Sequence, residues 1–282
     1  MAAAVADGFM DDTALQQLRR FIVQGYLKIE PATSKEVQND ARSIRAKILS
    51  CPMDVPNPLY HSLKSPSGDA AGNNLLHVAH SEMIGKSFLD SPELVDTLSN
   101  LLGLEYRVHP HSRTHLRDKG AETTMWHVDI HKGAWSSQRY HEPHYVIVSY
   151  YPQDTTIDMG PTEILPGSQY YRCDHDLENF NRGSYPNLSS QISGWATIPQ
   201  AFTCKAGTIM VMHYDLWHRA LQCTKESSNR LMLKFVAYRT KKPGSCILKY
   251  NRLPPFELAF FTDQNMDDLS NNPLLDFLNK KP

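Results

Sequence analysis

The chain has 282 residues, of which 41% are hydrophobic and 10% aromatic, and its 29 basic residues nearly balance its 30 acidic ones. A chain of this length can bury a core without disulfide staples, and its composition is far from that of a disordered protein. The formal net charge of -1 argues against a nucleic-acid partner, and no apolar run reaches the ~20 residues that span a membrane.

Helices dominate the predicted elements of the first third of the chain. Apolar residues at helical spacing predict a helix over 12–25, and alternation predicts a short strand over 26–30. A capping-box pattern opens a second helix over 33–49. Proline, serine, glycine and asparagine predict a loop over 51–74, and a Ser-Pro start and a closing glycine delimit a third helix over 91–103.

From about residue 105 the chain consists of short alternating or apolar runs that turn residues separate, and these runs predict strands. They cover 105–109, 123–129, 144–151, 162–166, 196–199, 207–213 and 230–239. This number and spacing of strands is typical of a sandwich or barrel. We therefore expect one domain over 1–282, with a helical support region at 1–104, the barrel core at 105–240 and a C-terminal extension at 241–282.

The cysteines and the amino-terminal residues bear on the compartment. The first dozen residues contain neither a basic segment nor a long apolar one, so we expect no secretory signal. The five cysteines are odd in number, widely spaced and without a Cys-x-x-Cys pair. This usage argues against a disulfide framework or a structural zinc site, and it predicts a cytoplasmic protein.

Histidines are concentrated in one stretch, where seven of the thirteen lie between residues 109 and 144. Within it, His127 and Asp129 are two residues apart, and on a strand such residues project to the same face. A histidine and a carboxylate side by side supply two ligands of a 2-His-1-carboxylate site, which leaves positions open on a non-heme Fe(II). Alone, the tripeptide equally fits a strand histidine hydrogen-bonded to a carboxylate.

The third ligand has to come from a distant strand, because the His-x-Asp strand cannot surround the metal. Gly207 begins an apolar run that ends at His213, His218 follows, and Arg230 opens the next apolar run twelve residues later. The rigid fork of an arginine across the pocket suits a dicarboxylate. This order predicts a metal site that works with an oxo acid. His213 is the alternative to His218, Arg239 is the alternative to Arg230, and His131 is a competing ligand on the strand face of His127 and Asp129.

Four motifs together resemble the phytanoyl-CoA dioxygenase family of Fe(II)/2-oxoglutarate-dependent oxygenases and cover most of residues 15–240. They are His127-x-Asp129; Met159-Gly-Pro-Thr-Glu-Ile-Leu-Pro-Gly-Ser168, similar to N-G-x-x-x-x-x-P-G-S-H; Gly207…His213…His218…Arg230, similar to G-D-x-x-x-F-H-x-x-x-x-H…R; and Phe21…Gly25-Tyr26, similar to F-x-x-x-G-Y. The resemblance implies a mainly β fold with a helical N-terminal cap, namely a double-stranded β-helix (a jelly-roll, cupin-like barrel).

Residue by residue, the resemblance implies that His127, Asp129 and His218 bind Fe(II) and that Arg230 binds the 5-carboxylate of 2-oxoglutarate. The implied reaction uses O₂ to oxidise, most simply to hydroxylate, a small organic molecule, and releases succinate and CO₂. Because Asp129 leaves no vacant ligand place for a halide, we expect hydroxylation, or a related desaturation or ring-forming oxidation, rather than halogenation.

Four positions depart from the family's pattern. Met159 replaces an asparagine, Gln169 replaces the histidine after Pro-Gly-Ser, Thr208 replaces an aspartate, and Val128 replaces a glutamine that is frequent between the two ligands. The alternatives to a 2-oxoglutarate oxygenase are a cupin-type metalloenzyme and a non-catalytic metal- or ligand-binding barrel. The arginine at position 230 argues against the cupin-type alternative.

Substrate contacts are expected from the two long segments that match no member of the family closely, 131–143 and 170–200, which should form walls or a lid over the iron. Candidate contacts there are His131, Arg139, Arg172 and Arg182, for which a solvated loop position is the competing interpretation. Lys234, on the strand face of Arg230, is expected to be a solvated strand tip. The sequence indicates no oligomeric state.

Overall fold

The computed structural model describes residues 12–31, 35–50, 69–72, 88–108, 113–129, 143, 145–170, 198–224 and 229–240. Its helices are α1 (Asp12–Gln24), α2 (Lys35–Ser50), α5 (Pro92–Leu102) and the short 3-10 helix η2 (Ser168–Tyr170). Its strands are β1 (Tyr26–Ile29), β2 (Asp69–Gly72), β3 (Arg107–Val108), β4 (Arg113–Arg117), β5 (Tyr145–Tyr151), β6 (Thr162–Ile164), β7 (Gln200–Ala201), β8 (Thr208–His213), β9 (His218–Ala220) and β10 (Arg230–Tyr238).

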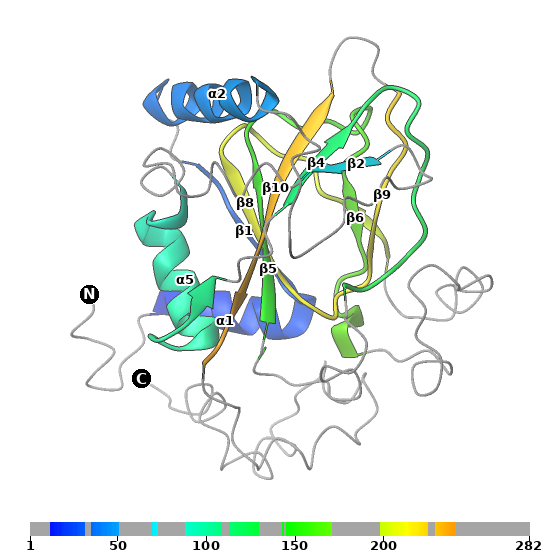
Figure 1. Ribbon diagram of the computed structural model, residues 1–282. Coiled ribbons are helices and arrows are strands. Elements are labelled where there is room, and N and C mark those ends of the chain that lie inside the picture. The colour runs from blue at the N-terminus through cyan, green and yellow to red at the C-terminus, as the bar shows by residue number, and fades with distance from the viewer. Residues whose placement is uncertain are drawn as a thin grey trace.

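The strands form two antiparallel sheets (Figure 1). The larger, 7-stranded sheet has the order β1-β8-β5-β10-β4-β2, with β3 also paired to β10, and the smaller, 3-stranded sheet has the order β7-β6-β9. Strands that are neighbours in space come from distant parts of the chain, since β8 lies between β1 and β5 and β10 lies between β5 and β4. This mainly antiparallel architecture with few helices is the predicted fold class.

Strand β10 shows how the larger sheet separates two environments, because its side chains alternate between the two faces. Leu231, Leu233 and Phe235 are buried in the cluster that includes the helices. Met232 points the other way and packs in a second cluster with Ile164 of the smaller sheet. The even-numbered positions of β10 therefore face the space between the two sheets.

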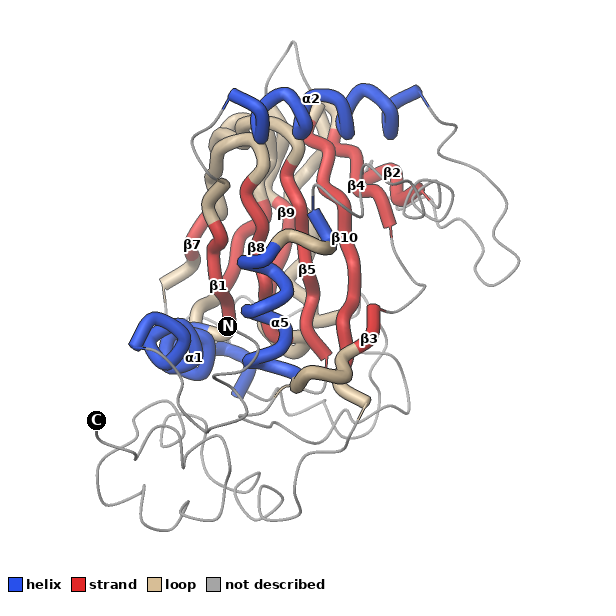
Figure 2. Tube along the Cα trace, turned by 90° about the vertical axis from the view of Figure 1, so that its left-hand side faces the viewer, coloured by secondary structure: helices blue, strands red, loops and turns tan. Residues whose placement is uncertain are grey.

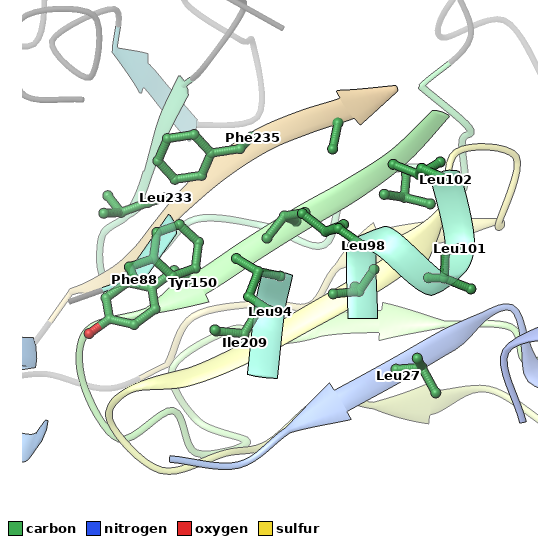
Figure 3. Close-up of a cluster of buried hydrophobic side chains, with 14 of the residues drawn as sticks. Leu27, Phe88, Leu94, Leu98, Leu101, Leu102, Tyr150, Ile209, Leu233 and Phe235 are labelled. Atoms are coloured by element: carbon green, nitrogen blue, oxygen red, sulfur yellow. The ribbon is translucent and has the colours of Figure 1, made fainter. Parts of the chain in front are cut away.

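Helices cover the outer face of the larger sheet. In Figure 2, α5 lies in front of this sheet, with α2 across one end and α1 across the other. Four leucines at helical spacing give α5 its buried side, and Figure 3 shows them beside aromatic and leucine side chains of the sheet. They are Leu94, Leu98, Leu101 and Leu102. Each fully buried leucine or phenylalanine contributes about 1.5–3 kcal/mol, so this face anchors the sheet against the helical support region.

The boundary between α1 and β1 depends on a glycine. Gly25 has φ +78, in the left-handed region, and its amide donates to the carbonyl of Phe21 at 2.7 Å. A Cβ at this position would lie 2.7 Å from a methyl carbon of Leu216 and would also collide with the side chain of Gln169. Both the conformation and the close approach therefore require glycine.

Several predicted elements are confirmed, including the first and third helices and the strands at β1, β5, β8 and β10. The loop prediction for 51–74 is wrong at 69–72, which form β2, paired with β4. The strand prediction for 123–129 is also wrong, because this extended segment makes only an isolated bridge at His127. Strands β4 and β9 were not predicted, and β7 lies just after the expected 196–199.

The predicted capping residues of α2 and α5 differ in what the structure shows of them. The capping-box residues before α2 lie partly outside the described residues. Ser91 precedes α5, and Pro92 occupies the first turn as expected, but the Ser91 side chain makes no capping hydrogen bond. Its backbone carbonyl instead accepts from the amide of Val95 at 3.0 Å. Among the described residues, no helix is long and apolar enough to cross a membrane.

Candidate metal centre

Three side chains with metal-binding atoms meet between the two sheets. His127, Asp129 and His218 each offer one ligand atom, and these atoms all lie within 4.8 Å of one another. Asp129 and His218 are buried, and His127 is partly buried. Two imidazoles and one carboxylate, held this close and shielded from water, are a donor set that suits a non-heme Fe(II) with open coordination positions.

Backbone pairing brings the two histidines together. The amide of His127 donates to the carbonyl of His218 at 3.0 Å, and the amide of His218 donates back to the carbonyl of His127 at 3.0 Å. Thr124 extends this pairing, since its amide and hydroxyl both bond to the backbone of Ala220. The His-x-Asp segment is therefore held along β9 by a few specific bonds, and the two imidazole rings lie with centroids 4.4 Å apart.

The ring orientation of both histidines is fixed in the same way. Nδ1 of His127 lies 2.9 Å from the carbonyl oxygen of Met125, and Nδ1 of His218 lies 2.9 Å from that of Leu216. A carbonyl only accepts, so each Nδ1 carries the proton and donates it. Each Nε2 then keeps its lone pair, and a backbone bond to the other nitrogen is the usual way in which a metal-binding histidine is held.

The environment keeps His218 neutral. Burial, with the neighbouring His127 adding to it, lowers the pKa of His218 to about 3, although Asp129 acts in the opposite direction. The Nε2 of His218 lies 3.7 Å from Oδ2 of Asp129. A neutral imidazole beside a carboxylate is the protonation state in which both groups can donate electron pairs to a cation.

Lys234 also reaches this carboxylate. Its ammonium group donates to Oδ2 of Asp129, and its side chain is only 15% exposed. The prediction that Lys234 is a solvated strand tip is therefore wrong. Side chains alternate along β10, so Lys234 lies on the same face as Arg230. This face points into the space between the sheets, and its polar side chains line the site.

Arg230 is buried, with 2% of its surface exposed, which excludes an exposed strand end. In the sheet it is paired with Arg117 of β4, whose guanidinium donates to the carbonyls of Ala121 and Glu122. Burial raises the pKa of Tyr151 to about 12 even though Arg230 is close enough to lower it. Arg230 is thus a buried cation close to the phenol of Tyr151 and paired in the sheet with a second arginine, an environment that fits a carboxylate ligand.

The alternative residues lie elsewhere. The His213 ring lies tilted against that of Phe21 in α1, with ring centroids 6.1 Å apart, and its Nδ1 accepts from the amide of Asp215 at 3.1 Å. His213 therefore faces α1 and is not in the metal group. Arg239 donates to the backbone carbonyls of Pro143 and Leu101. The candidate substrate residues lie outside the described residues: His131, Arg139, Arg172 and Arg182.

Sequence reasoning missed His115 at this site. It lies on β4 opposite Met232, and Lys234, Arg230 and Asp129 all act on its ionisation. Burial is the largest cause that lowers its pKa well below the usual value, so the ring is neutral. The available signal was the alternation Arg113-Thr-His115-Leu-Arg117, which puts three basic or polar side chains on one face of a strand.

Trp126, Arg219 and Glu163 form a group of contacts, here called the clamp, on the side of the two ligand-bearing segments that faces away from the metal-binding atoms. The Arg219 guanidinium lies 4.5 Å from the centroid of the Trp126 ring, and its Nε donates to Oε2 of Glu163 at 2.6 Å. Trp126 precedes His127 and Arg219 follows His218, so this cation–π and ion-pair contact joins the neighbours of two metal ligands. The clamp helps to fix the separation of the two histidines.

The Pro-Gly-Ser-Gln turn has a structural role. The hydroxyl oxygen of Ser168 accepts from the amide of Trp217 at 3.0 Å, and the Gln169 side chain donates to the carbonyl of Ile22 at 2.9 Å. The Gly167 amide donates to the carbonyl of Gln24 at 2.9 Å. This turn therefore links α1 to the residue that precedes His218, and the Gln169 side chain makes part of the link.

Comparisons with known proteins agree with this geometry. A model of the phytanoyl-CoA dioxygenase family matches residues 21–230. No curated protein sequence matches the chain. Among solved structures, EctD from S. alaskensis, with 2-oxoglutarate and 5-hydroxyectoine, is similar with a TM-score of 0.62 at 18% identity, over 83% of this chain and 80% of that chain.

Two further solved structures show the same fold. The non-heme α-ketoglutarate-dependent epimerase SnoN from nogalamycin biosynthesis has a TM-score of 0.59 at 15% identity, over 81% of this chain and 84% of that chain. HygX from Streptomyces hygroscopicus, with nickel, 2-oxoglutarate and hygromycin B bound, has a TM-score of 0.56 at 17% identity, over 80% of this chain and 87% of that chain. These likenesses confirm the predicted jelly-roll fold.

Proposed function

Because the chain belongs to the phytanoyl-CoA dioxygenase family, we propose that it is an Fe(II)- and 2-oxoglutarate-dependent dioxygenase that hydroxylates a small organic molecule and releases succinate and CO₂. One observation carries the proposal. The ligand atoms of His127, Asp129 and His218 lie within 4.8 Å of one another, and the buried Arg230 shares the inward face of β10 with Lys234, which contacts Asp129. A metal site and a buried arginine together are what an oxo-acid cosubstrate requires.

Each residue has a defined part in this proposal. His127, Asp129 and His218 hold Fe(II), which together with the oxo acid and O₂ supplies the oxidising chemistry when bound. The backbone-held rings and the carboxylate would hold the metal from the protein side, and they would leave its remaining positions to the oxo acid and O₂. Arg230 orients the cosubstrate through its distal carboxylate, and the buried position of these groups excludes water.

Asp129 bears on the type of oxidation. Its carboxylate occupies the third protein position of the metal site, so no such place is open for a halide ligand. This supports hydroxylation, or a related desaturation or ring closure, over halogenation. A test is to supply chloride or bromide during turnover and to search the product by mass spectrometry, where a halogenated product would contradict the assignment.

A small-molecule substrate is supported by the structural neighbours, whose described ligands include 5-hydroxyectoine and hygromycin B. We propose that residues 131–143 and 170–200, most of which lie outside the described residues, contact this substrate. His131, Arg139, Arg172 and Arg182 are the candidates there. Alanine variants of the three arginines should raise the KM of the substrate more than that of 2-oxoglutarate, and unchanged values in all three variants would reassign them as solvated charges.

We further propose that the whole chain is one catalytic domain in the cytoplasm. The match of the family model to residues 21–230 supports the first part, since it joins the helical support region and both sheets in one unit. Limited proteolysis should then leave a single core that contains the N-terminal helices and the metal centre. Separation of the helices from an intact barrel would contradict this organisation.

The experiment that tests the function is a consumption screen of the Fe(II)-loaded protein. Succinate release is measured with candidate lipids, acyl-thioesters, amino acids and terpenoid or alkaloid natural products, each with and without Fe(II). Succinate coupled to a hydroxylated product supports the proposal. Oxidation of a compound without any need for 2-oxoglutarate would favour a cupin-type enzyme, and metal binding without turnover of any compound would favour a non-catalytic barrel.

A further inference from the structure

Two cationic side chains on one strand face the metal centre. Arg230 and Lys234 are four residues apart on β10, and both occupy the face of Met232, between the two sheets. Arg230 is the proposed partner of the distal carboxylate of 2-oxoglutarate, whereas Lys234 contacts Asp129. We propose that Lys234 is a second anchor for the 2-oxo acid, with its ammonium bound to the 1-carboxylate that chelates the metal; this inference rests on the proposed function.

The spacing of the two cations leaves room for the cosubstrate. Four residues of strand correspond to roughly 13 Å between the Cα atoms of Arg230 and Lys234. The terminal carbons of an extended five-carbon dicarboxylate are about 5 Å apart, and a charge-assisted hydrogen bond adds ~2.8 Å at each end, which makes about 11 Å in all. This length is shorter than the Cα separation, so one dicarboxylate can lie between the two side chains, with one carboxylate for each cation.

The contact with Asp129 places the ammonium beside the metal's coordination positions. Asp129 Oδ2 is the oxygen that faces both Nε2 of His218 and the ammonium of Lys234. Ligand atoms in neighbouring positions around one octahedral metal lie about 3 Å apart. The Lys234 ammonium, which touches an oxygen of Asp129, is thus within hydrogen-bond reach of a ligand oxygen in the neighbouring position of the metal. A carboxylate oxygen in that position would attract the ammonium more strongly than neutral water or O₂ would.

His115 supplies an independent observation at the same place. Its position on β4, opposite Met232, is midway between the positions that pair with Arg230 and Lys234. Its Nε2 is enclosed and has no hydrogen-bond partner among the described residues. Buried polar atoms are nearly always satisfied, by protein, water or ligand. A polar ligand that extends from Arg230 to Lys234 would pass His115 and could complete its hydrogen bonding.

A purely structural salt bridge between Lys234 and Asp129 has different consequences. If Lys234 serves only to hold Asp129 in place, its removal should weaken metal binding. If Lys234 anchors the oxo acid, its removal takes a positive charge away from the metal, so metal binding should be unchanged or tighter. Oxo-acid binding should then weaken. The two roles therefore differ in whether the removal of Lys234 weakens metal binding.

The experiment uses two oxo acids as probes under anaerobic conditions with the Fe(II)-loaded protein. 2-Oxoglutarate has both carboxylates, and 2-oxopentanoate carries a methyl group in place of the distal one. Binding is followed by the charge-transfer absorption of the Fe(II) chelate. The variants are Lys234→Gln, Lys234→Arg and Arg230→Ala, and Lys205→Gln is the matched control because Lys205 forms an exposed pair with Asp154 at 3.0 Å.

We expect Lys234→Gln to weaken both acids by roughly 10- to 100-fold, the effect of one charge-assisted hydrogen bond. Arg230→Ala should weaken 2-oxoglutarate alone, Lys234→Arg should retain part of the affinity, and Lys205→Gln should match the wild type. Co(II) should bind the Lys234→Gln variant at least as tightly as the wild type, which also shows that this variant is folded.

Three results would overturn the inference: Lys234→Gln binds both acids as the wild type does, loses affinity for 2-oxoglutarate alone, or loses Co(II) affinity. Failure of the proposed function gives a different result. In that case the Fe(II)-loaded wild-type protein itself would not bind 2-oxoglutarate, whatever the variants do.

Discussion

Asp129 is the one carboxylate in the three-residue metal group, and its Oδ2 faces both His218 and Lys234. The two histidines are neutral electron-pair donors, since each gives its Nδ1 proton to a backbone carbonyl. At the scale of single residues, the site therefore combines one negative charge with two neutral ligands and leaves a divalent metal positively charged. That residual charge favours an anionic chelating ligand over water.

The first prediction concerns the metal ligands. Removal of a residue that only supports a ligand typically costs about 10–100-fold in metal affinity. The double variant His127→Ala/His218→Ala removes two ligands themselves, so its Fe(II) affinity should fall by at least about 100-fold. The wild type should bind about one equivalent in an anaerobic titration. His213→Ala is the control and should bind Fe(II) normally, since His213 faces Phe21. An equally deep loss in the His213 variant would show that the wrong histidine was chosen.

The second prediction concerns Arg230, which is buried on the face between the sheets. Loss of the arginine partner of a buried carboxylate typically costs ~3–5 kcal/mol, or roughly 10²–10³-fold in affinity. Arg230→Ala should therefore bind Fe(II) normally and need far more 2-oxoglutarate, as measured by the KM in coupled turnover. Arg230→Lys should recover part of the loss, because it keeps the charge but not the fork. A wild-type KM in the alanine variant would move the cupin-type alternative to first place.

At the scale of elements, the metal centre depends on a short segment that is not a regular strand. Residues 120–129 run along 218–223, which include β9, and are held there by backbone bonds at Ala121, Thr124 and His127. The clamp of Trp126, Arg219 and Glu163 supports this pairing from the opposite side. Positions of the two histidines are therefore set jointly by the smaller sheet and by this clamp.

The third prediction tests the clamp. Arg219→Met should lower the free energy of unfolding by about 1–3 kcal/mol, because it removes a cation–π contact and leaves Glu163, which is only 14% exposed, without this partner. Metal affinity should fall by about tenfold or less, since the Arg219 side chain contacts Trp126 and Glu163, which are outside the metal group. Arg219→Lys keeps the charge and should lie between the two. Unchanged stability and metal binding in Arg219→Met would show that backbone pairing alone fixes the histidines.

The fourth prediction uses the two faces of β10. Phe235 is buried against Phe88, with ring centroids 5.2 Å apart, on the helical side of the sheet. Phe235→Leu should cost roughly 1–2 kcal/mol of stability in urea unfolding, because it leaves a partly filled cavity. Fe(II) and 2-oxoglutarate affinities should not change. A loss of cosubstrate affinity in this variant would mean that the two faces of the sheet are coupled.

At the scale of the whole molecule, two sheets enclose the site while helices cover the outer face of the larger one. The sequence predicted this class because the strand runs, the His-x-Asp tripeptide, the distal histidine and the arginine are all local patterns. Their meeting in space could be inferred only through the family's fold. The place of a residue in the site is harder to predict where it depends on which strands pair and in which register.

His115 and Lys234 illustrate this limit. Both lie on strands whose polar side chains face inward, which reverses the usual rule that polar positions face solvent. Strand β4 was not recognised for this reason, and Lys234 was expected at the surface. The register between β4 and β10 places these two residues on one face of the sheet, and Asp129 meets them there from the segment that pairs with His218. The extended segment before Asp129 was mistaken for a strand because alternation alone does not show whether a ladder of partners exists.

The central claim is that one metal and 2-oxoglutarate meet in the site between the sheets, and equilibrium binding tests it most directly. 2-Oxoglutarate is titrated anaerobically onto the protein with and without Fe(II), and the Fe(II) chelate absorption and the bound fraction are recorded. We predict saturable binding of about one equivalent that requires Fe(II) and that is lost in the His127→Ala/His218→Ala variant. Fe(II)-loaded wild-type protein that binds no 2-oxoglutarate at millimolar concentration would contradict the account.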